Sequence, residues 1–112
     1  MSIQITRERP DTPDAAALIA ELQASLAPLY PSANQFGYSI EKLIQQDVAF
    51  FVIRADDTPA ACGGVQIFGD AYGEVKRMFV RPQFRGMGLA KLMLAQLEAY
   101  THARGVPLLR LE

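Results

Sequence analysis

A glycine-rich turn between Val80 and Ala90 holds the residues best suited to chemistry, and an amphipathic helix begins directly after it. The first backbone N–H groups of a helix have no partner within the helix and give its start a partial positive charge. Gly86 and Gly88 let a bulky anion lie against the main chain, and Arg85 adds a full positive charge. The spacing therefore predicts a site that binds phosphate groups.

The strand before the turn and the turn itself form a two-part pattern. The strand reads Arg77-Met78-Phe79-Val80-x-Pro82, and the turn reads Gln83-x-x-Gly86-x-Gly88. Together they closely resemble the acetyl-CoA signature of the GNAT superfamily of N-acetyltransferases. The resemblance implies that backbone amides of the turn hold the pyrophosphate of acetyl-CoA, while the strand pairs its main chain with the pantetheine arm. It implies coenzyme-binding roles for Met78, Phe79, Val80, Gln83, Arg85, Gly86, Met87, Gly88, Leu89 and Ala90.

Two other phosphate-binding loops do not fit this stretch of sequence. The chain has no Gly-x-x-x-x-Gly-Lys-Ser/Thr sequence. Position 91 is lysine, where a Gly-x-Gly-x-x-Gly fingerprint needs its third glycine. One structural alternative stays open, in which Gly86 and Gly88 only form a tight turn between strand and helix.

Glu74 is the candidate general base for acetyl transfer to an amine, which must lose a proton as the amide forms. It stands six residues before Val80 and matches the position of the glutamate base in histone-acetylating GNAT members. The alternative is an edge-strand charge paired with Lys76 or Arg77, two residues that are otherwise expected to be solvated. A main-chain N–H between Met78 and Val80 is expected to stabilise the charge that develops on the thioester oxygen.

The acceptor is expected to approach the thioester from the side opposite the coenzyme. The segment Tyr30–Tyr38 is aromatic, polar and punctuated by glycine, as binding loops often are. We therefore expect Tyr30, Phe36 and Tyr38 to form a pocket for a primary amine of a small molecule or an amino-acid-like acceptor. An ordinary connection between two helices is the alternative.

Cys62 and His102 are the single cysteine and the single histidine of the chain, and neither is expected in the active site. Cys62 lies in an apolar strand without a neighbouring base, which favours a buried structural thiol over an acyl-enzyme nucleophile. His102 comes late in the helix after the turn, where a surface position is expected. One Cys and one His are too few for an ordinary zinc site, so we expect no metal. Gly63 and Gly64 indicate a bulge, a close backbone approach or a flexible strand start.

The elements that position these residues follow from hydrophobic periodicity and turn residues. The first of two early helices has Asp11 or Thr12 as its cap, Pro13 at its first position and its end at Pro28. The second is short and begins at the Ser39 cap. Their inward faces are expected to consist of Leu18, Ile19, Leu22, Leu26 and Leu29, then Ile40, Leu43 and Ile44.

The remaining elements are strands and one long helix. Strands are expected at Ile3–Arg7, Val48–Ile53, Ala60–Phe68, Tyr72–Val80 and Leu108–Leu111. The helix is expected over Gly86–Arg104, with Leu89, Leu92, Met93, Leu97 and Tyr100 facing the core. The resulting order, β-α-α-β-β-β-α-β, indicates an α+β fold with a mixed, mostly antiparallel GNAT-type sheet flanked by helices.

A single N-acetyltransferase domain over residues 1–112 is expected, and it stops before the full family pattern. Members of the superfamily continue with a helix and two strands that usually carry a tyrosine acid, and this segment is missing. We therefore expect a truncated domain in which catalysis can be lost, with a complete minimal domain as the alternative. The last strand would leave an open sheet edge, which favours pairing with a second copy in a homodimer.

Composition narrows the class of protein further. Half of the 112 residues are hydrophobic, which is enough for one core. There is no apolar run of membrane-span length and no secretory signal, so a cytoplasmic protein without membrane contact is expected. The formal net charge of -1 argues against a nucleic-acid binder. Three functions stay open: an N-acetyltransferase, a coenzyme A-binding regulatory module or inactive fragment without catalysis, and a structural domain that binds no nucleotide.

Overall fold

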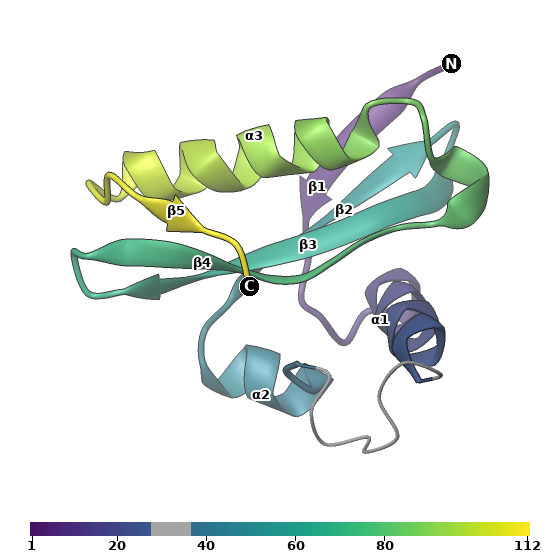
Figure 1. The fold of residues 1–112 in the computed structure, drawn as a ribbon. Helices are drawn as coiled ribbons and strands as arrows, with labels where there is room; N and C mark the ends of the chain where they lie inside the picture. Colours follow the sequence, from purple (N-terminus) through teal and green to yellow (C-terminus); the bar gives the residue numbers. More distant parts are fainter. Residues whose placement is uncertain (28–36) are drawn as a thin grey trace.

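The structure is a computed structural model that describes residues 1–27 and 37–112. Within these residues five strands form one sheet in the order β1-β2-β3-β4-β5, with helices on both faces (Figure 1). The expected element order is confirmed: β1 Ile3–Arg7, α1 Pro13–Leu26, α2 Ile40–Gln45, β2 Ala49–Ala55, β3 Thr58–Phe68, β4 Tyr72–Val80, α3 Leu89–Ala103 and β5 Leu109–Arg110. The residues named above that lie outside the described part are Pro28, Leu29, Tyr30 and Phe36.

The pairing of the strands confirms the expected mixed, mostly antiparallel sheet. The pairs β1/β2, β2/β3 and β3/β4 are antiparallel, and β4/β5 is parallel. A parallel pair needs a crossover connection, and α3 provides it between β4 and β5.

Both early helices begin at side-chain caps. Thr12, one of the two expected caps of α1, accepts a hydrogen bond from the Ala15 N–H at 3.3 Å. Pro13 takes the first helical position, where its missing N–H breaks no helical hydrogen bond. α1 ends at Leu26, and α2 begins after the Ser39 cap as expected. No helix in residues 1–27 and 37–112 is long and apolar enough to cross a membrane.

A two-residue turn joins β2 to β3. Asp56 and Asp57 both have positive φ, +48° and +69°, which is the backbone that such a tight hairpin requires. β3 therefore begins at Thr58, two residues earlier than expected. Pro59 is tolerated inside the strand because the register between β2 and β3 shifts at this point.

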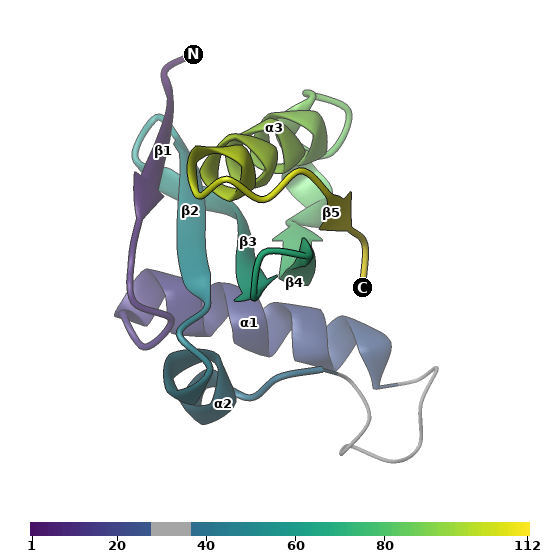
Figure 2. The ribbon, with the colours of Figure 1, turned by 90° about the vertical axis from the view of Figure 1, so that its left-hand side faces the viewer.

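The hydrophobic core has two halves, one on each face of the sheet. Along β2, Phe50 and Val52 face α1 and α2, whereas Phe51 and Ile53 face α3, because side chains alternate along a strand. Figure 2 shows α3 on one side of the sheet and α1 with α2 on the other. The sheet is therefore covered by helices on both sides, and a functional site must lie at its edges or between the covering helices.

Two expectations for α3 are wrong in detail. The helix begins at Leu89 and not at Gly86, because Gly88 is its cap with a left-handed φ of +78°. Leu92 was expected to face the core, but it is 38% exposed. Leu89, Met93 and Leu97 are buried at a spacing of four residues, which turns the inward face of the helix away from Leu92.

β5 is shorter than the expected strand Leu108–Leu111. It pairs with β4 only at Gly73 and Glu74, and Leu108 and Leu111 are 51% and 71% exposed. From residue 75 to residue 80, no described strand pairs with the outer edge of β4 (Figures 1 and 2). Pairing of a sheet edge with a second copy of the chain stays a prediction.

Candidate active site

The turn over residues 82–88, called the glycine turn from here on, joins β4 to α3. It starts with a short 3-10 helix over Pro82–Phe84. Gly86 and Gly88 follow with φ of +82° and +78°, which other residues rarely adopt. A Cβ atom added to either glycine would meet no atom within 4 Å, so backbone conformation, and not crowding, requires glycine here. The space over both glycines is open to a ligand.

The start of α3 supplies N–H groups to this space. The first helical hydrogen bond runs from the Leu92 N–H to the Gly88 carbonyl at 3.0 Å, so the N–H groups of residues 89–91 have no partner within the helix. No described backbone carbonyl accepts a hydrogen bond from residues 86–88. A pocket at this place is lined by Val80, Phe84, Arg85, Gly86, Gly88, Leu89 and Ala90. Most residues with predicted coenzyme roles thus lie together, whereas sequence reasoning missed Phe84.

The backbone of β4 alternates between facing β3 and facing the open edge. The Arg81 N–H donates to the Ala60 carbonyl of the neighbouring chain segment, so the N–H of Phe79 points the same way. The N–H groups of Met78 and Val80 then point outward. The Val80 carbonyl also points outward, because it accepts a hydrogen bond from Arg85 Nε at 3.1 Å. Two outward N–H groups therefore lie beside the pocket of the glycine turn.

A bulge interrupts the pairing of β3 with β4 before this outward-facing stretch. The register shifts between Cys62 and Gly64, and Arg77 on β4 has a φ of +52°. A Cβ atom on Gly64 would lie 2.7 Å from Val48 Cγ1, which is too close for any other residue. The bulge and the close approach predicted at Gly63-Gly64 are both confirmed.

Glu74 belongs to a partly buried polar cluster around Lys76, which we call the Lys76 cluster. Lys76 Nζ lies 2.5 Å from a carboxylate oxygen of Glu74 and 3.5 Å from one of Glu112. It also lies 4.2 Å from the centre of the Tyr38 ring, and the Tyr38 hydroxyl donates to Gln66 Oε1 at 2.7 Å. The structure thus contains the ion pair between Glu74 and Lys76 that was the alternative role of Glu74. At this point β4 lies between β3 and β5, so Glu74 is on an inner strand and not at a sheet edge.

The expectation that Lys76 and Arg77 are solvated is wrong. They are 5% and 3% exposed. Burial disfavours the charge on Lys76, but its contacts with Glu74 and Glu112 outweigh this effect, so the pKa of Lys76 is raised. Burial lowers the pKa of Arg77, against the opposing charge of Glu112. The bulge explains the difference from a surface strand, because it turns Arg77 under α1, where Arg77 Nη2 donates to Gln23 Oε1 at 2.8 Å.

A second pocket lies between α1 and α2, on the face of the sheet opposite α3. We call it the helix pocket. Its described lining residues are Ala16, Ile19, Ala20, Gln23, Gly37, Tyr38, Ser39, Ile40, Lys42 and Arg77. Tyr38 lines this pocket, and its role in binding an acceptor stays a prediction, while Tyr30 and Phe36 are outside the described residues. Arg77 lines this pocket and Val80 lines the pocket of the glycine turn, so a span of three residues on β4, roughly 10 Å, connects the two.

Arg81 is a residue of structural importance that sequence reasoning missed. It follows β4 directly and forms two hydrogen bonds to the Glu21 carboxylate on α1, at 2.9 and 2.6 Å. A third hydrogen bond, at 2.7 Å, reaches the Pro59 carbonyl. Arg81 thereby ties α1 to the point at which the glycine turn begins.

Cys62 is fully buried, as expected for a structural thiol. Burial raises its pKa to about 12, and the thiol donates to the Arg77 carbonyl at 3.4 Å. A thiol in this state is a poor nucleophile at neutral pH. His102 is exposed near the end of α3, also as expected.

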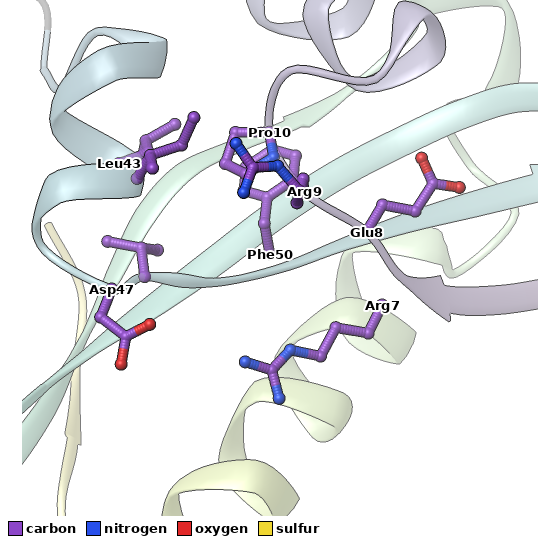
Figure 3. Close-up of a pocket in the computed structure, with 9 residues that line it drawn as sticks. Arg7, Glu8, Arg9, Pro10, Leu43, Asp47 and Phe50 are labelled. Carbon is purple, nitrogen blue, oxygen red and sulfur yellow. The ribbon is translucent and has the colours of Figure 1, made fainter.

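A third pocket lies between the end of β1 and α2, and Figure 3 shows its lining side chains, among them Arg7, Glu8, Arg9 and Leu43. Three of its charged side chains, those of Arg7, Glu8 and Arg9, are engaged in other contacts. Arg7 stacks on Tyr100, Glu8 pairs with Arg54 at 2.6 Å, and Arg9 pairs with Asp11 at 3.0 Å. This pocket has no contact with β4 or the glycine turn, so it is a weaker candidate for the active site than the helix pocket.

Comparisons with known proteins agree with this geometry. A curated relative, the IAA acetyltransferase of Azospirillum brasilense, is 36% identical over 112 residues, which is 99% of this chain and 73% of that protein. A crystal structure of a candidate acyl-CoA N-acyltransferase from Klebsiella pneumoniae is 31% identical, with a TM-score of 0.77 over 97% of this chain and 70% of the other.

More distant structures share the fold. The PaiA N-acetyltransferase of Thermoplasma acidophilum, solved in complex with coenzyme A, is 22% identical, with a TM-score of 0.71 over 95% of this chain and 76% of that protein. The model of the acetyltransferase (GNAT) family matches residues 16–112, which include β4, the glycine turn and α3. The chain thus belongs to the GNAT family of acetyltransferases and is an acyltransferase.

Proposed function

We propose that the protein transfers an acetyl group from acetyl-CoA to a primary amine of a small molecule. The observation that carries this proposal is the glycine turn, where Gly86 and Gly88 have positive φ and the N–H groups at the start of α3 have no partner within the helix, the arrangement that favours binding of an anion. The open edge of β4 beside it supports a place for the pantetheine arm, with Met78 and Val80 as the main-chain partners. The coenzyme A bound to the PaiA relative supports the choice of co-substrate.

The proposed reaction is direct transfer. The neutral amine forms a C–N bond with the thioester carbon, the C–S bond breaks, and coenzyme A leaves as a thiolate that takes a proton from water. Glu74 accepts the proton of the amine, directly or through a water molecule. An outward N–H of Met78 or Val80 stabilises the charge on the carbonyl oxygen. The helix pocket, with Tyr38 in its wall, holds the acceptor next to Arg77 on β4.

Calorimetry with acetyl-CoA and a thiol-release assay with a panel of primary amines test the proposal together. We expect binding, amine-dependent release of thiol, and a gain of about 2.7 kcal/mol in the free energy of unfolding when acetyl-CoA is present at about 100 times its Kd. Binding without thiol release would favour a regulatory module or inactive fragment that binds coenzyme A without catalysis. Absence of both would favour a structural domain.

A further inference from the structure

Lys76 is a buried lysine inside a central stretch of sheet, where a charged side chain needs partners. Its neighbour Val75 packs in the half of the core under α3. Side chains alternate along a strand, so Glu74 and Lys76 point to the opposite face of the sheet, the face of the helix pocket. Lys76 and the proposed base thus lie side by side on that face.

Three groups surround the Lys76 ammonium. Its Nζ lies 2.5 Å from Glu74 Oε1, 3.5 Å from Glu112 Oε2 and 4.2 Å from the centre of the Tyr38 ring. Burial alone would lower the pKa of Lys76, but the hydrogen bond to Glu74 and the charge of Glu112 raise it. The ammonium therefore keeps its charge in the neutral pH range.

The two carboxylate oxygens of Glu74 have different surroundings. Oε1 accepts a hydrogen bond from Lys76 Nζ, whereas Oε2 accepts none from any residue of 1–27 or 37–112. One oxygen is therefore held in place by a charged donor. The other is available to take a proton, which is what a general base requires.

Glu112 acts against Lys76 in this cluster. Its carboxylate approaches the same ammonium as Glu74, so two negative charges share one positive charge. A second carboxylate close to the first favours protonation of one of them, and partial burial of Glu74 acts in the same direction. The contact with Lys76 opposes both effects.

Other titratable or charged groups stand around the cluster but are not paired with Glu74. They are Tyr38 and Lys42 beside the helix pocket, Arg77 on β4, and Arg110, which is opposite Glu74 on β5 and lies over the Tyr72 ring. On β3 the residue opposite Glu74 is the neutral Gln66. Within residues 1–27 and 37–112, Lys76 is the cation that forms an ion pair with Glu74.

We propose that Lys76 is a positioning residue for Glu74: it holds one oxygen of the carboxylate and keeps the group ionised, so that the other oxygen can accept the proton of the acceptor amine. The inference rests on the proposed function and adds a residue to it. Without the ammonium, Glu74 would be exposed to the charge of Glu112 in a partly buried site, and it would take up a proton more readily. A protonated carboxyl group cannot act as the base.

The pH dependence of acetyl transfer tests this role. Thiol release is measured from about pH 5 to about pH 9, at saturating acetyl-CoA, with the best acceptor of the amine panel. When kcat/KM is expressed per concentration of neutral amine, the loss of rate at low pH reports the protonation of the base. This acid limb should be absent in Glu74→Gln.

Lys76→Met removes the ammonium and keeps an unbranched side chain. The acid limb should move to higher pH by about 1–3 units, the range for the effect of a nearby opposite charge on a carboxylate. Lys76→Arg keeps a positive charge and should leave the limb close to its natural position. Glu112→Gln removes the competing carboxylate, so its limb should move in the opposite direction, to lower pH.

Arg54→Met is the matched control. Arg54 also joins two carboxylates, those of Glu8 at 2.6 Å and Asp14 at 2.8 Å, but it lines neither the helix pocket nor the pocket of the glycine turn. The loss of this cation should lower the free energy of unfolding and leave the pH profile unchanged.

The outcomes separate the two proposals. An acid limb that stays in place in Lys76→Met, that moves as far in Arg54→Met, or that persists in Glu74→Gln overturns the role of Lys76 while acetyl transfer stands. If Lys76→Met does not fold, Glu112→Gln decides, and a limb at unchanged or higher pH overturns the inference. Absence of thiol release with every amine overturns acetyl transfer, and the inference with it.

Discussion

The glycine turn and the helix pocket are built in opposite ways. The turn consists of one continuous stretch, and the groups proposed to bind the coenzyme there are backbone N–H groups in a conformation that requires Gly86 and Gly88. The helix pocket is lined by side chains from α1, α2 and β4. The positions of the charged groups at its wall depend on the contacts of Lys42 and Lys76 with the Tyr38 ring. The first kind of site tolerates most changes of side chain, whereas the second is sensitive to each of them.

The largest effect on turnover is expected for Glu74, the side chain proposed as the general base. Glu74→Gln keeps the shape of the side chain but removes its ability to accept a proton, so kcat should fall by about 10²–10⁴. Coenzyme affinity should stay nearly the same, because Glu74 stands on β4 far from the glycine turn. Steady-state kinetics and calorimetry with acetyl-CoA measure the two quantities.

Glu112→Gln is the matched control for that change, because Glu112 contacts the same Lys76 ammonium. If Glu74 is the base, Glu112→Gln lowers kcat much less. Equal losses in the two variants would show that both carboxylates only neutralise Lys76, and Glu74 would then have no role in proton transfer.

Gly86→Asp should be the most damaging change in the glycine turn. It places a carboxylate in the open space proposed for the pyrophosphate and a Cβ atom on a residue with a φ of +82°. We expect coenzyme affinity to fall by at least about 100-fold, which corresponds to roughly 2.7 kcal/mol. Gly69→Asp introduces the same strain at a φ of +59° in the turn between β3 and β4, and it should leave affinity unchanged. Equal affinities in both variants would argue against the turn as the coenzyme site.

The contrast between the two regions also explains what the sequence predicted. The turn, the helix after it and the caps Thr12 and Ser39 are local features, and each was visible in a few adjacent residues. The burial of Lys76 and Arg77 was not visible, because it depends on a bulge in β4 and on partners far along the chain, such as Gln23 and Glu112.

Some predicted limits of strands and one predicted core position were wrong for a similar reason. β3 begins before the expected Ala60 because the register shift next to Pro59 accommodates a residue that usually ends a strand. β5 is short because its register with β4 covers only Leu109 and Arg110, although the Leu108 carbonyl also accepts a hydrogen bond from the Gly73 N–H at 2.8 Å. Leu92 was assigned to the core on spacing alone, although a neighbouring stripe of α3 is the buried one.

Arg81 tests whether the two regions depend on one another. Arg81→Ala removes two hydrogen bonds to Glu21 and one to the Pro59 carbonyl, and we expect the free energy of unfolding to fall by about 1–2 kcal/mol. Arg9→Ala breaks a similar ion pair that is fully exposed, and it should leave stability unchanged. Urea unfolding of both variants measures the difference, and equal stabilities would remove Arg81 as the tie between α1 and the glycine turn.

The smallest effect on turnover is expected at Cys62, although it lies beside the bulge next to Arg77. The pKa of Cys62 is raised to about 12 in the folded protein, while an unfolded thiol titrates at about 8.5. Below pH 8 the thiol is protonated in both the folded and the unfolded state, so it contributes no pH dependence to the free energy of unfolding. Between these two pKa values the unfolded state binds fewer protons, so Cys62 lowers the free energy of unfolding by about 1.4 kcal/mol per pH unit.

Cys62→Ala should therefore turn over acceptors within about twofold of the natural protein, a difference of only about 0.4 kcal/mol. Its free energy of unfolding should also decline less steeply above pH 9 than that of the natural protein, because the contribution of the Cys62 thiol is removed while all other groups titrate equally in both proteins. Urea unfolding at pH 7, 9 and 10, together with thiol release at pH 7, checks both statements. A large loss of turnover in Cys62→Ala would assign the thiol a part in the chemistry. The active site would then include a side chain of β3, and the hydrogen bond from the Cys62 thiol to the Arg77 carbonyl would be more than a structural contact.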